Sequence, residues 1–116
     1  MSQLASAAVR NRRLNRRQLP KGSTKATCHK GLFGLGRDIA VAVLDMSLYG
    51  AQLVVKEALK PGQPVEVGLE GLGRQKPIRL PAAVVWCVQG ADGNYLVGTR
   101  FERSLSYADM QALARP

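Results

Sequence analysis

The sequence has few of the side chains on which catalysis and metal binding depend. Its 116 residues include one histidine, two cysteines and eight acidic residues, with no evident carboxylate dyad. The histidine, His29, follows Cys28 directly, and adjacent side chains on a strand point to opposite faces, so the two cannot form a nucleophile–base pair. Cys87 adds a third candidate zinc ligand, but no pair has the usual ligand spacing. We therefore expect a protein that is not an enzyme, with no catalytic residues and no metal site.

Long hydrophobic runs are also missing. The longest, residues 39–44 and 82–85, are far shorter than the roughly 20 residues of a membrane-spanning helix. Arg10 ends the short apolar run at residues 7–9, so the sequence predicts no secretion signal. Two cysteines without such a signal indicate reduced thiols. We expect a cytoplasmic protein with no membrane span.

Acidic residues are absent from the first 37 residues, which carry nine lysines and arginines. The rest of the chain has eight basic and eight acidic residues, so the whole net charge of +9 lies in the first third. A neutral body with a basic arm indicates an anionic partner, such as a nucleic acid, a nucleotide or an acidic membrane surface; a disordered solubilising tail is the alternative. Residues 11–21 have no apolar period and contain Pro20. We assign residues 1–22 to a flexible basic arm and residues 23–116 to one globular domain.

Beyond the arm, short runs of alternating apolar and polar residues are separated by glycine and proline. The expected strands are residues 25–29, 38–44, 50–56, 65–69, 78–88 and 95–101. The second run is almost continuously apolar, as in a strand that is buried on both faces or bent through a core. Pro81 indicates that the fifth strand is bent or at a sheet edge rather than central.

The end of the chain is the one segment with helical spacing. Ser106, three residues before Asp109, predicts an N-cap for a helix near residues 105–114. The pattern as a whole predicts an all-β fold, a small six- or seven-stranded antiparallel β-barrel with one C-terminal helix. Its inward or half-buried residues are expected to include Val65, Val67, Leu69, Val84, Trp86, Leu96 and Phe101.

Four arginines occupy six consecutive positions of the arm, as Arg12, Arg13, Arg16 and Arg17. The guanidinium group is a planar fork that binds phosphate oxygens, or the O6/N7 edge of guanine, through two hydrogen bonds. In an extended segment, side chains four positions apart lie on the same side roughly 13 Å apart, which suits the two ends of a dinucleotide. A basic run for RNA binding or nuclear localisation is the alternative interpretation.

A second cluster of polar residues lies between two expected strands. Asp45, Ser47 and Gly50 can form a turn in which the carboxylate and the hydroxyl face outward and the glycine allows a tight backbone. The alternative is an Asx-type turn in which Asp45 and Ser47 bind their own backbone.

Together the two segments resemble the PilZ domain family, bacterial receptors for cyclic di-GMP. That family has R-x-x-x-R in a basic arm, followed about thirty residues later by D-x-S-x-x-G between strands, and G-x-x-F in the last barrel strand. The family's second arginine leads directly into the first strand, whereas residues 18–22 intervene here. The resemblance spans residues 10–114, and its matches are Arg12…Arg16 (preferred) or Arg13…Arg17, then Asp45, Ser47 and Gly50, then Gly98-Thr99-Arg100-Phe101.

The resemblance implies a binding role for each matching residue. Arg12 and Arg16 would fold over the ligand and bind phosphate or guanine, and Arg13 or Arg17 would stack on a base. Asp45 would accept hydrogen bonds from guanine or hold an arginine in place. Ser47 would bind the ligand, and Gly50 would let the backbone approach it.

The resemblance also implies a function. Cyclic di-GMP would be a ligand, with no cofactor, and its binding would change the conformation of the arm, which an unidentified protein effector reads. The alternative function is a small basic β-barrel that binds RNA or DNA through its arm. Such proteins place aromatic residues on an exposed sheet face, and the six aromatic residues of this chain include no pair at strand spacing.

Overall fold

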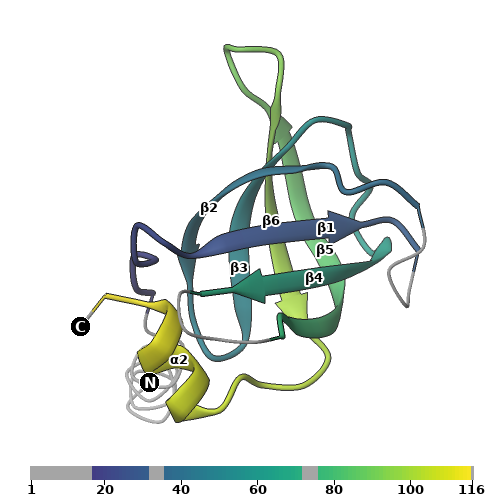
Figure 1. Cartoon of the computed structure of the whole chain (residues 1–116). Coiled ribbons are helices and arrows are strands. Elements are labelled where there is room, and N and C mark those ends of the chain that lie inside the picture. Colours follow the sequence, from purple (N-terminus) through teal and green to yellow (C-terminus); the bar gives the residue numbers. More distant parts are fainter. Residues whose placement is uncertain (1–16, 32–35, 72–75, 116) are drawn as a thin grey trace, which may run out of the picture.

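The computed structural model describes residues 17–31, 36–71 and 76–115, which form one sheet and one helix (Figure 1). The sheet contains six strands, and a short helix follows the last of them. The elements are β1 (Lys25–His29), β2 (Ala40–Met46), β3 (Gly50–Val55), β4 (Pro64–Glu70), β5 (Ile78–Gln89), β6 (Tyr95–Phe101) and α2 (Tyr107–Leu113).

The strands pair antiparallel in the order β1-β4-β5-β6-β3-β2. The sheet curls until its two edge strands, β1 and β2, face each other across a seam (Figure 1). One end of the seam is held by a bridge between His29 and Asp38, beside which the Ile39 N–H donates to the Cys28 carbonyl at 2.9 Å. The result is a nearly closed barrel, so the predicted six-stranded all-β fold is confirmed.

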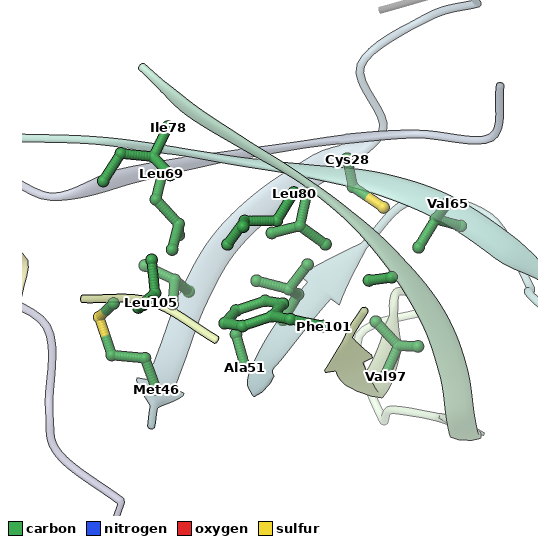
Figure 2. Close-up of a cluster of buried hydrophobic side chains, with 14 of the residues drawn as sticks. Cys28, Met46, Ala51, Val65, Leu69, Ile78, Leu80, Val97, Phe101 and Leu105 are labelled. Atoms are coloured by element: carbon green, nitrogen blue, oxygen red, sulfur yellow. The ribbon is translucent and has the colours of Figure 1, made fainter. Parts of the chain in front are cut away.

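The barrel is filled by hydrophobic side chains from every strand, several of which are drawn in Figure 2. At the helix, the Ser106 Oγ accepts a hydrogen bond from the Asp109 N–H at 3.0 Å, so the predicted N-cap is confirmed. Met110 and Leu113 of α2 join the core. Of the expected inward or half-buried residues, Trp86 and Leu96 are half-buried, and the buried ones are Val65, Val67, Leu69, Val84 and Phe101.

One expectation about a single strand needs correction. β5 is central, between β4 and β6, and not at an edge. The backbone of Pro81 faces β6, and its carbonyl accepts from the Glu102 N–H at 2.8 Å, just past the last residue of β6. The missing N–H of Pro81 therefore removes no hydrogen bond from the paired residues of β5 and β6, which is why the proline is tolerated. The strand does bend, through a register shift between Val84 and Trp86.

Of the two alternatives expected for β2, the structure shows the bent strand and not the one buried on both faces. Its pairing with β3 shifts register between Ala40 and Ala42 and again between Val43 and Asp45. The extra residues at these bulges, Val41 and Leu44, are 50% and 40% exposed. The bulges bend the strand, and the run is divided between its two faces, with Val43 and Met46 in the core and Val41 and Leu44 outside.

Candidate ligand-binding site

The described end of the basic arm, residues 17–21, lies between β2 and the segment that follows α2. On one side, Gln18 and Met46 exchange two backbone hydrogen bonds, at 2.8 and 2.9 Å. On the other side, the Arg115 N–H donates to the Leu19 carbonyl at 2.7 Å and the Lys21 N–H to the Leu113 carbonyl at 2.9 Å. The residues that separate the arginines from β1 are therefore hydrogen-bonded to β2 on one side and to residues 113–115 on the other.

This pairing brings the two polar motifs together at Arg17 and Asp45. Arg17 lies one residue from the Gln18–Met46 bridge, opposite Ser47, so Asp45 is its diagonal neighbour, within reach of a long side chain. The Arg17 Nη1 and the Asp45 Oδ1 form an ion pair at 3.3 Å. The side chains are 44% and 24% exposed, and such pairs contribute only about 0–1 kcal/mol to stability. The contact matters because it places an arm guanidinium on the carboxylate.

One carboxylate oxygen of Asp45 lacks a hydrogen bond within the described part of the chain. Its Oδ1 atom is buried and accepts no hydrogen bond from the residues that the structure describes, and the contact with Arg17 is an ion pair only. A buried carboxylate oxygen without a hydrogen bond is costly, and here the Arg17 guanidinium at 3.3 Å compensates its charge. Because the atom is buried, a ligand N–H reaches it only when the groups around it shift. The alternative in which Asp45 binds its own backbone is therefore not what the structure shows.

Ser47 and Gly50 shape the turn between β2 and β3. Ser47 is buried, its N–H donates to the Gly50 carbonyl at 2.9 Å, and its Oγ accepts from the Tyr49 N–H at 3.2 Å. A Cβ on Gly50 would overlap the Thr99 carbonyl oxygen of β6. The backbone interpretation thus describes Ser47, and the glycine is required by packing of β3 against β6.

The sheet register aligns Asp45 with residues that the sequence did not connect to it. Asp45 pairs with Gln52, Gln52 with Gly98, and Gly98 with Trp86, which makes one row across β2, β3, β6 and β5. The row faces outward, because its neighbours Leu53 and Val97 are fully buried. The Trp86 indole lies on Gly98, where a Cβ would overlap the ring. The row exists only through pairing of strands that are distant in the sequence. Trp86 and Gly98 can be read from the sequence as single residues, but not as neighbours of Asp45.

Comparison with known protein families gives a match. The model of the PilZ domain matches residues 11–115. The chain belongs to the PilZ domain family. A comparison with curated proteins finds no match. PilZ domains are receptors for cyclic di-GMP and are generally not enzymes.

The PilZ match begins before the arginine cluster and ends at the segment that pairs with the arm. Arg12, Arg13 and Arg16 lie outside the described residues, so the structure places Arg17 alone of the four. Among the described residues, no cluster of three or more histidine, cysteine or acidic side chains could hold a metal ion. No helix in the described part is long and apolar enough to cross a membrane.

The two thiols of the PilZ domain are free. Burial, and to a smaller extent the nearby Asp38 carboxylate, raises the pKa of Cys28 to about 12. Because the thiolate is the reactive form, Cys28 is inert at neutral pH and serves as a small core residue.

Proposed function

We propose that this PilZ domain is a cyclic di-GMP receptor in which the arm arginines close over the face that carries Asp45. The observation that supports the proposal is the Arg17–Asp45 ion pair at 3.3 Å, which joins the arginine cluster to the D-x-S-x-x-G motif. Both parts of the ligand then have a partner of suitable chemistry, since arginines bind phosphates and a carboxylate binds guanine N–H groups.

Each predicted site residue has a role in this proposal. Arg12 and Arg16 bind phosphate or the guanine edge, and Arg13 or Arg17 stacks on a base. The Asp45 carboxylate accepts from guanine N1 or N2 once the groups around its Oδ1 shift. Ser47 and Gly50 hold the turn that presents Asp45, Ser47 through the Tyr49 N–H and Gly50 by letting β3 pack against β6.

Signalling follows from how the arm is held. Residues 17–21 are hydrogen-bonded to β2 beside the site and to the segment after α2. A ligand that draws the arginines toward Asp45 acts on both sets of bonds, so the arm position reports occupancy to a protein effector. In this scheme residues 1–22 move, residues 23–116 are the scaffold, and the receptor works in the cytoplasm.

Isothermal titration of the whole chain with cyclic di-GMP tests the proposal, with GTP and a short single-stranded RNA as comparators. We expect micromolar or tighter binding of cyclic di-GMP, about −8 kcal/mol or better. Arg16→Ala should cost about 1.5–3 kcal/mol, the value of a charge-assisted hydrogen bond. The charge-matched control is Lys56→Ala with Lys60→Ala, two exposed lysines in the connection between β3 and β4. If the Arg12→Ala/Arg16→Ala protein binds as tightly as that control, the site lies elsewhere.

A further inference from the structure

A groove of about 460 Å³ runs along the seam between β1 and β2. It lies away from the His29–Asp38 bridge, where the two strands do not pair, and is lined by residues 20–22, 24–26 and 41–43. Its apolar lining comes from Ala26 and the β2 residues 41–43, including Val41, which is half exposed at a bulge. The proposed cyclic di-GMP site at Asp45 is not part of this lining.

The groove carries two basic residues, of which Lys25 lies opposite Glu70 in the β1–β4 pairing. Lys21 and Lys25 line it, both exposed, and no acidic residue does. Of the five basic residues that the structure describes between positions 17 and 37, three form ion pairs with Asp45 or Glu57. Lys21 and Lys25 are the two that have no ion pair within the described part of the chain. The groove therefore favours an anionic occupant.

The groove also offers backbone groups. Cys28 directs its N–H to the Asp38 Oδ1 and its carbonyl to the Ile39 N–H, both at 2.9 Å, on the side away from β4. Backbone groups two residues apart on a strand point the same way, so Ala26 directs its N–H and carbonyl into the seam. β2 does not pair with β1 there. An extended peptide can form main-chain hydrogen bonds with such an edge.

We propose that the groove binds an extended acidic segment of a protein partner. Alternate side chains of a strand face opposite ways. A segment that alternates apolar and acidic residues therefore places its apolar side chains on the floor of the groove, which is the apolar lining from Ala26 and residues 41–43, and its acidic side chains toward Lys21 and Lys25. Lysines at an exposed sheet edge discourage pairing with most strands, whereas they attract an acidic one. A polyanion without apolar side chains would leave the floor uncovered.

The inference deepens the proposed function, because it assigns a chemistry to the effector that reads the arm. Lys21 and Gly22 line the groove and directly follow the arm residues that pair beside Asp45, so a shift of the arm reshapes the groove. That link rests on the proposed function. Binding of an acidic strand in the groove does not, and it is measured without cyclic di-GMP.

The experiment is fluorescence anisotropy of the whole chain with a labelled, end-capped nonapeptide that alternates glutamate and valine. Lys21→Glu/Lys25→Glu should weaken binding about tenfold or more, since two attractive pairs become repulsive. Lys56→Glu/Lys60→Glu makes the same charge reversal outside the groove and should change the affinity by no more than about twofold. Nonaglutamate should bind at least about fivefold more weakly, because it leaves the floor exposed. The Ala26 amide proton should become protected from exchange when the alternating peptide is bound.

Three results would overturn the inference. Equal losses in the two double variants would show long-range attraction without a site, and equal binding of nonaglutamate would show that charge alone is recognised. Binding of oligouridine or phosphatidylglycerol vesicles that Lys21→Glu/Lys25→Glu abolishes, with no binding of the peptide, would assign the groove to another anion. If the peptide binds as expected and cyclic di-GMP does not bind in calorimetry, the proposed function fails and the groove remains.

Discussion

Asp45 and Gly50 belong to one six-residue motif, yet they act at different levels of the structure. Asp45 presents a carboxylate whose buried Oδ1 has an ion-pair contact and no hydrogen bond from the described residues. Gly50 has no such chemistry, and its lack of a side chain lets β3 approach the Thr99 carbonyl of β6. Substitution of Asp45 should therefore alter ligand affinity, whereas substitution of Gly50 should alter folding.

Gly50→Ala tests the second half of that statement. The added methyl group overlaps a backbone oxygen that cannot move without disturbing the β3–β6 pairing. Overpacking of this kind costs about 1–3 kcal/mol, which urea unfolding would measure as a lower midpoint. Gly22→Ala is the control, because a Cβ at Gly22 meets nothing within 4 Å. Equal midpoints for the two variants would mean that Gly50 is not required for packing.

Cys28 predicts how stability depends on pH. The folded protein holds the pKa of this thiol at about 12, above the ordinary value of 9.0, chiefly through burial. The unfolded chain therefore loses the proton first, and the contribution of the neutral thiol is fully present below pH 9 and is lost as the pH rises toward 12. The free energy of unfolding should fall by at most about 1.4 kcal/mol per pH unit in that window, in excess of the fall in Cys28→Ala. Identical slopes in chemical unfolding of the two proteins would refute this.

At the scale of elements, the alternation of apolar and polar residues predicted where the strands lie but not which strands pair with each other. The expected strands at residues 25–29 and 95–101 match β1 and β6, because turn residues bound both runs and alternate side chains enter the core. β2 begins two residues later than expected, since its bulges break the alternation that a sequence pattern needs. Pro81 fits in a central strand because the paired part of β6 ends beside it. The sequence near Pro81 does not contain that information.

The candidate site shows the same division. The sequence predicts the turn that contains Asp45, Ser47 and Gly50, because the residue preferences of a turn are local. The contact of Arg17 with Asp45 depends on the Gln18–Met46 bridge, between segments with no common periodicity. The row from Asp45 to Trp86 depends on three strand pairings, so no local pattern contains it.

That row makes the single tryptophan a reporter of the site. Three strand spacings of about 4.8 Å separate Trp86 from Asp45, roughly 14 Å along the outer face, so a dinucleotide lying on the row reaches the indole. Cyclic di-GMP should change the Trp86 fluorescence in a saturable way, with the dissociation constant found by calorimetry. Asp45→Asn should shift both curves equally, and Glu102→Gln, an exposed carboxylate with the same charge change, should shift neither. Ligand saturation by calorimetry without a fluorescence change would show that the ligand does not extend along the row.

At the scale of the whole molecule, the basic residues of the first third divide into groups with different tasks. Lys30 and Arg37 each contact the Glu57 carboxylate at 2.7 Å. The Lys30 hydrogen bond is the main reason that the pKa of Glu57 is lowered. These two cations hold the loop ends near the closed part of the seam, so they add little to the attraction of distant anions. The net charge of +9 therefore overstates the charge that a ligand meets.

Salt separates a cyclic di-GMP receptor from a general nucleic-acid binder. Single-stranded RNA carries a condensed counterion layer, and neutralising six phosphates would lower its affinity about 10⁴-fold between 0.05 and 0.5 M salt. Cyclic di-GMP has two phosphates and no such layer, and contacts of guanine with Asp45 are short and partly desolvated, so its binding should persist at about 0.3–0.5 M salt. Asp45→Ala should weaken cyclic di-GMP and leave RNA binding unchanged or slightly stronger, because it removes a negative charge. Titrations across this salt range measure both effects. If RNA outcompetes the dinucleotide at moderate salt, and Asp45→Ala affects neither, the basic arm acts as a nucleic-acid binder and the receptor proposal is wrong.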